Sequence, residues 1–137
     1  HFISSKEFKE KIKTDFFLEW SNWYDNYYGS PKSMLEEIEQ GKSYIAILDQ
    51  DGAHDILQRY SQAFLVWIQP SSLSLLIGRL KKRGKDTVQE IENRVKKAEV
   101  ELARKKREDI FHSTVINDDF LKAKDELILL IRKKIKE

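Results

Sequence analysis

Apolar residues recur at intervals of three and four along much of the chain, a period that is typical of amphipathic helices. Ser4 with Glu7, and Thr87 with Glu90, have the spacing of capping boxes, and Gly84 is a good C-terminal stop. The predicted helices begin at Ser4, run from Ser30–Pro31 to Gly41, span 53–60 and 72–83, extend from Thr87 to Arg107, and run from a cap at 117–119 to Ile135.

Short apolar runs between turn-forming residues predict strands. The predicted strands are 2–3, 16–20, 43–48, 63–68 and 114–116, with a loop or a hairpin at 23–29 and a polar turn at 49–52. Strands alternate with helices from Ser43 onward, which predicts an α/β fold with a mostly parallel sheet. Ligands bind beyond the carboxyl ends of strands in such sheets, so Asp49 and Asn117 are candidate site residues.

Composition narrows the class of protein. The 137 residues suggest one domain, and the 40% that are hydrophobic suffice for a packed core. The net charge is only +2, which gives no strong reason to expect nucleic acid. A nucleic-acid patch at Arg104–Arg107 is the weaker alternative, because cations at the end of a helix suit its dipole.

The chain has no cysteine, which excludes disulfides, thiolate metal sites and a cysteine nucleophile. This composition is consistent with a reducing compartment, and a cytoplasmic protein is expected. The three histidines are scattered without carboxylate partners at metal spacing, so no zinc site is predicted. No apolar run approaches the roughly 20 residues that span a membrane, and no membrane partner is expected.

Glu19 is the one carboxylate in the apolar run Phe16–Trp20, and Tyr28 and Ser30 follow it closely. An ionised carboxylate accepts two parallel hydrogen bonds, and the guanine edge offers two such donors side by side. A phenol such as that of Tyr28 suits a phosphate oxygen. The stretch can therefore hold a guanine nucleotide at both ends; the alternative is a half-buried strand whose glutamate faces water.

Several patches together resemble guanylate kinases, in the right order and over essentially the whole chain. Phe17–Trp20 with Asn26–Ser30 resembles the base-binding insert of that family, and Gly41-Lys42 with Asp49 and Gly52-Ala53 resembles its next block. Two patches resemble the lid: Pro70-Ser71 with Arg79-Leu80 and Arg83-Gly84, and Glu90-Ile91 with Arg94. Val115–Asp119 resembles the closing motif.

The resemblance implies phosphoryl transfer from ATP to GMP, with Mg²⁺ accompanying ATP. It implies a P-loop-kinase-like, mostly parallel sheet flanked by helices, with a small mixed α/β GMP-binding insert and a helical lid. The insert is expected at 1–41 and the rest of the kinase core at 42–137, with the lid at about 79–108. GMP and ATP are the implied partners.

The resemblance also assigns roles to individual residues. On the GMP side, Glu19 would bind the guanine edge, Ser30 would assist at the base, Tyr28 would bind the phosphate and Asp49 would lie near GMP. On the ATP side, Arg83 and Arg94 would be catalytic lid arginines that reach the phosphates, and Asn117 would lie beside the adenine.

The chain departs from the family pattern in two respects. It lacks the phosphate-cradling glycine-rich loop and the remaining GMP-phosphate ligands, which leads us to expect a piece of a longer kinase that is inactive alone. Ile47 stands where the family usually has an acid, and Asp51 where it usually has glutamine. The alternative function is a guanylate-kinase-like protein-interaction module that has lost catalysis.

Overall fold

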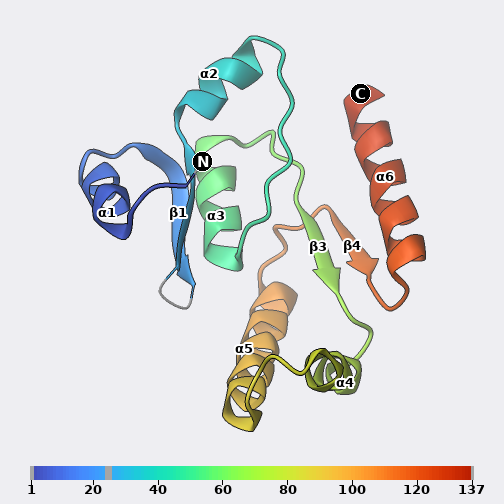
Figure 1. Ribbon diagram of the computed structural model, residues 1–137. Coiled ribbons are helices and arrows are strands. Elements are labelled where there is room, and N and C mark those ends of the chain that lie inside the picture. The colour runs from blue at the N-terminus through green and yellow to red at the C-terminus, as the bar shows by residue number, and fades with distance from the viewer. Residues whose placement is uncertain (1, 24–25, 137) are drawn as a thin grey trace. The chain divides into compact units, whose positions relative to one another are not determined.

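The computed structural model describes residues 2–23 and 26–136. The chain divides into two compact units, residues 1–63 and 64–137, and each is described by itself (Figure 1). Both units combine helices with a small sheet, so the α/β class predicted from the sequence is confirmed at that level.

The first unit is built around a β-hairpin. Helix α1 (Ser5–Lys13) precedes the antiparallel strands β1 (Phe17–Trp23) and β2 (Asn26–Pro31), and helices α2 (Ser33–Glu39) and α3 (Gln50–Arg59) follow. The Ser4 hydroxyl accepts a hydrogen bond from the Glu7 amide at 3.1 Å, so the predicted cap of α1 is confirmed. The strand predicted at 16–20 and the hairpin after it are confirmed as well.

An aromatic cluster packs one side of the hairpin against α1. The Phe8 ring stacks on Phe17 with centroids 4.2 Å apart and on Tyr27 at 5.2 Å. Gly29 makes this packing possible, because a Cβ there would lie 3.0 Å from the Phe17 ring and 3.1 Å from Phe8. The aromatic cluster thereby fixes the hairpin against α1.

Three local predictions are wrong in this unit, besides the turn predicted at 49–52, where α3 begins. Residues 43–48 and 2–3 form no strand, and the Ile47 side chain is fully exposed. A strand exists only when its backbone is paired, and no segment of the described chain pairs with either stretch. No helix starts at Ser30–Pro31, because β2 continues through Pro31 and α2 begins at Ser33.

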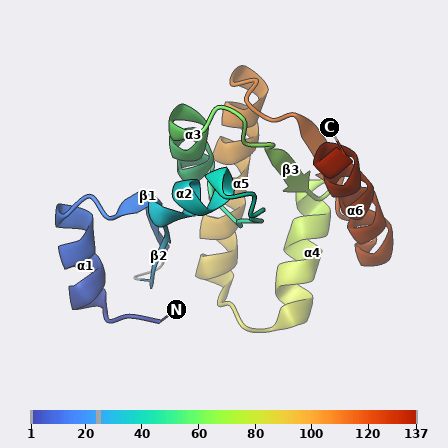
Figure 2. The same cartoon turned by 90° about the horizontal axis from the view of Figure 1, so that it is seen from above.

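The second unit combines a short parallel sheet with three helices. Strands β3 (Val66–Gln69) and β4 (Ser113–Ile116) pair in parallel, and Val115 in β4 is fully buried. Helices α4 (Leu73–Arg83) and α5 (Val88–Arg107) lie side by side and are joined by a short loop (Figure 2). Helix α6 (Phe120–Lys136) packs on β4.

The predicted helix ends of this unit are confirmed. The Ser72 hydroxyl accepts from the Leu75 amide, Gly84 ends α4 with φ 64°, and Asp119 accepts from the Lys122 amide. The single, mostly parallel sheet is not confirmed: the described strands form one antiparallel and one parallel pair. No helix within the described residues is long and apolar enough to cross a membrane.

Candidate functional site

The centre of the candidate site is the pair formed by Glu19 on β1 and Ser30 on β2. The two residues are directly opposite in the hairpin register, and the Ser30 hydroxyl donates to Glu19 Oε1 at 2.6 Å. Glu19 is only 5% exposed. Ser30 therefore orients the carboxylate from within the hairpin, a role that is incompatible with capping a helix.

The first turn of α3 lies against the same carboxylate. Asp49 is the N-cap of α3, and its Oδ1 accepts from the Gly52 amide at 2.9 Å. A Cβ at Gly52 would lie 3.0 Å from Glu19 Oε2 and 3.2 Å from Asp49 Oδ1. The polar turn predicted at 49–52 is thus the start of a helix, and its glycine lets two carboxylates converge.

Burial raises the pKa of Glu19 above its ordinary value. Hydrogen bonds from the Ser30 hydroxyl and backbone oppose the rise, whereas the negative charges of Asp49 and Asp55 add to it. A ligand that supplies N–H donors stabilises the ionised form of such a carboxylate. The arrangement suits a planar group with two adjacent N–H donors.

Tyr28 lies on the same face of the hairpin as this pair. It is opposite Ser21 and two residues from Ser30, and alternate residues of a strand point to one face. The residue is 59% exposed, so it is accessible to a ligand. The first unit thus brings Glu19, Ser30 and Asp49 together and presents Tyr28 beside them.

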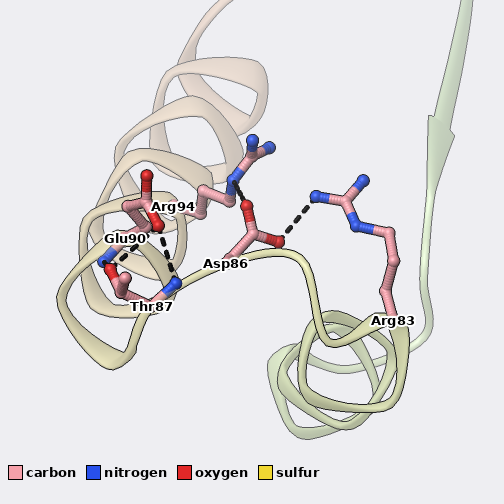
Figure 3. A network of polar contacts seen from close by, with 5 residues as sticks. All are labelled: Arg83, Asp86, Thr87, Glu90 and Arg94. Atoms are coloured by element: carbon pink, nitrogen blue, oxygen red, sulfur yellow. Dashed lines mark hydrogen bonds and ion pairs between the residues drawn. The ribbon is translucent and has the colours of Figure 1, made fainter.

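The second group of predicted residues lies at the junction of α4 and α5. Arg83 ends α4 and Arg94 lies on α5, and both face Asp86 in the connecting loop (Figure 3). Arg83 Nη2 is 2.6 Å from Asp86 Oδ2, and Arg94 Nε is 3.2 Å from Asp86 Oδ1. Two guanidinium groups that are 11 positions apart in the sequence are thus gathered around one carboxylate.

Asn117 follows β4 in a loop that α4 holds in place. Its amide donates to the Gln69 carbonyl at 2.8 Å, and its carbonyl accepts from Arg79. Arg79 also donates to the Asp118 carbonyl at 2.7 Å, and Asp118 in turn accepts from the Ser71 amide. The structure thus places Asn117 in a defined loop at the carboxyl end of a strand.

Three residues of these regions were not predicted as site residues. Gly52 has a sequence signal, its place three residues after the helix cap Asp49. Asp86 has a weaker one, its spacing three residues after Arg83. Gln50 has none: it is buried, and its amide has no hydrogen-bond partner among the residues that the structure describes.

The described residues contain no group of three or more histidine, cysteine, aspartate or glutamate side chains arranged to hold a metal ion. Mg²⁺ needs no such group, because it keeps several waters and binds through substrate phosphates and one or two carboxylates. The absence of such a group among the described residues is therefore compatible with a magnesium ion that arrives bound to a nucleotide.

Known proteins match this chain over nearly its whole length. A family model described as guanylate kinase matches residues 1–134. The chain is 39% identical to the guanylate kinase of Maricaulis maris over 129 residues, which are 93% of this chain and 58% of that protein. It is 38% identical to the guanylate kinase of Gloeobacter violaceus over 135 residues, 98% of this chain and 64% of that protein.

A solved structure agrees in fold. The guanylate kinase of Anaplasma phagocytophilum matches with a TM-score of 0.72 at 20% identity, over 98% of this chain and 64% of that one. The chain thus spans 58% and 64% of the length of the two relatives.

Proposed function

Because this chain belongs to the guanylate kinase family, we propose that its protein transfers the γ-phosphoryl group of ATP to GMP, giving ADP and GDP. The sequence identity to proteins named guanylate kinase extends over nearly the whole of this chain, and it supports the proposal. In this proposal 1–41 is the GMP-binding insert and 42–137 belongs to a P-loop-kinase-like core with a lid at about 79–108. The lack of cysteine is consistent with a reducing compartment, so the proposal includes a cytoplasmic location.

The observation that carries the proposal is the Glu19–Ser30 pair. Glu19 is buried and already oriented by a 2.6 Å hydrogen bond, so guanine finds its acceptor in place. The two adjacent N–H donors of guanine match a carboxylate, whereas adenine presents a ring acceptor beside its amine. The Glu19 carboxylate therefore selects GMP over AMP by leaving the wrong base with unpaired polar groups.

The remaining residues act on the phosphates and on ATP. Tyr28 donates its hydroxyl to the GMP phosphate, and Asp49 lies beside GMP at the cap of α3. Arg83 and Arg94 bind the phosphates through guanidinium forks, which suit the dispersed negative charge of phosphoryl transfer. Asn117 lies beside the adenine of ATP. Mg²⁺ bound to ATP would neutralise charge on the phosphates.

Calorimetric titration of the full-length protein tests the assignment of Glu19. Glu19→Gln is expected to weaken GMP binding by about 1.5–3 kcal/mol, because a charged hydrogen-bond acceptor is lost, and to leave AMP binding nearly unchanged. Glu39→Gln makes the same chemical change at an exposed position of α2 and serves as the control. Equal, small losses for both nucleotides would contradict the role of Glu19.

A second experiment separates the kinase from a protein-interaction module that has lost catalysis. The full-length protein is incubated with Mg²⁺, ATP and either GMP or AMP, and the products are separated by chromatography. GDP formed with GMP and little product with AMP would support the kinase. Selective GMP binding without GDP formation would favour the interaction module.

A further inference from the structure

We propose that Asp86 is a positioning residue, which holds Arg83 and Arg94 together so that both guanidinium groups meet the transferred phosphoryl group. The proposal rests on the proposed function, because it assigns a task to the carboxylate between two arginines that the function uses. Figure 3 shows the arrangement, with Asp86 between the two side chains.

The contacts show that one carboxylate serves both cations. Asp86 Oδ2 is 2.6 Å from Arg83 Nη2, and Oδ1 is 3.2 Å from Arg94 Nε, so each oxygen faces a different helix. The Asp86 side chain is 7% exposed, whereas the side chain of Arg83 is 47% exposed. The anion is therefore enclosed by its partners, and a guanidinium group remains open to a ligand.

The backbone around Asp86 is fixed from both sides. Gly84 ends α4 in the left-handed conformation, with φ 64°. Thr87 begins α5 in a capping box: its amide donates to Glu90 Oε2 at 2.6 Å, and its hydroxyl accepts from the Glu90 amide at 3.3 Å. Asp86 is thus held between two defined helix ends, which gives its carboxylate a fixed place.

Electrostatics explain why an anion is needed there. Two guanidinium groups around one point repel each other, and the repulsion is stronger near low-dielectric protein than in water. Asp86 reduces their summed charge from +2 to +1, forms an ion pair with Arg94 and accepts a charge-assisted hydrogen bond from Arg83. Hydrogen bonds of this kind are shorter and stronger than neutral ones. The hydrogen bond from Arg83, together with the positive charges of Arg83 and Arg94, also lowers the pKa of Asp86, so it stays ionised. Without it, the arginines are expected to separate.

Steady-state kinetics of the full-length protein with ATP and GMP test this role. Asp86→Asn keeps the size of the side chain and removes its charge. We expect kcat to fall by about tenfold to a hundredfold, since misplaced catalytic groups cost that much, while the KM for GMP stays within about twofold. Asp86→Glu restores the charge and is expected to recover part of the loss. Asp109→Asn, at an exposed loop position, is the matched control.

A kcat of Asp86→Asn within about twofold of wild type would overturn the proposal. Thermal unfolding followed by circular dichroism establishes that each variant is folded, and Asp86→Ser replaces Asp86→Asn if the latter fails to fold. The effect must also act through the arginines. Adding Asp86→Asn to an Arg83→Gln, Arg94→Gln background should therefore cause no further loss, because coupled residues are not additive.

A readout that needs no catalysis keeps the two proposals distinguishable. Nitrogen-15 NMR follows exchange of the Arg94 Nε proton, whose nitrogen lies 3.2 Å from Asp86 Oδ1 in the wild type. We expect exchange to be faster in Asp86→Asn, by about tenfold or more, as for a group released from a charged partner. Unchanged exchange would overturn the proposal. If the wild type forms no GDP, the kinase proposal fails. Proton exchange alone then tests whether Asp86 holds Arg94 in position.

Discussion

At the scale of single residues, Glu19 illustrates a conflict between stability and binding. Because burial raises its pKa, the folded protein binds this proton more tightly than the unfolded chain does. Its contribution to stability is therefore favourable at low pH and is lost as the pH rises through the raised pKa. At neutral pH the ionised Glu19 destabilises the fold, as residues tuned for a ligand often do.

Glu19→Gln is accordingly expected to stabilise the protein at neutral pH, by about 1 kcal/mol, even though it weakens GMP binding. The amide keeps the size of the side chain and an oxygen acceptor for Ser30. Urea unfolding at pH 7 measures the change, with Glu39→Gln as the reference. A loss of stability in Glu19→Gln alone would show that the ionised carboxylate supports the fold.

The same shift predicts how guanine binding depends on pH. A guanine needs the carboxylate form of Glu19, and the ligand-free protein keeps the proton to a higher pH than an ordinary glutamate. Affinity should be constant above the raised pKa and should fall about tenfold for each pH unit below it. Guanosine is the appropriate ligand, because the phosphate of GMP itself titrates. The pH dependence should disappear in Glu19→Gln.

At the scale of elements, Gly52 allows a direct comparison within the chain. Gly52 and Gly78 both lie inside helices, where glycine costs about 0.5–1 kcal/mol relative to alanine. A Cβ at Gly78 meets nothing within 4 Å, whereas a Cβ at Gly52 lies 3.0 Å from the Glu19 carboxylate. The same substitution should therefore have different effects at the two positions.

Gly78→Ala is expected to raise the free energy of unfolding by about 0.5–1 kcal/mol without affecting GMP. Gly52→Ala should displace the Glu19 side chain, losing much of that gain and weakening GMP binding about tenfold or more. Chemical denaturation and calorimetric titration measure the two effects. Full GMP affinity in Gly52→Ala would mean that the carboxylate tolerates the added methyl group.

Elements specified by neighbouring residues were predictable from the sequence. The helix from Ser72 to Gly84 and the capping box at Thr87 depend on contacts within a few positions, and both predictions are confirmed. Elements that depend on distant partners were not. Residues 43–48 have the composition of a buried strand, but pairing is not encoded in the stretch itself.

The same difference between local and distant contacts explains which parts of the candidate site could be predicted. The resemblance picked out Ser30 for the base, but its local context, with Pro31 after it, favoured a helix cap. Ser30 lies in a strand instead, because the hairpin register places it opposite Glu19. The place of Asp86 between two arginines depends on how α4 and α5 turn, which no short motif in the sequence specifies.

At the scale of the molecule, the proposed GMP residues and the phosphate arginines belong to different units, so their effects should separate. Arg94→Ala is expected to leave GMP affinity within about twofold and to lower kcat on the order of a hundredfold, as the loss of one charge-stabilising donor does. Glu19→Gln should instead act mainly on GMP affinity, which it should weaken. Lys96→Ala, an exposed cation on the same helix, is the control for loss of charge. A large loss of GMP affinity in Arg94→Ala would place this arginine at the acceptor nucleotide instead, and Asp86 would then position a substrate-binding residue.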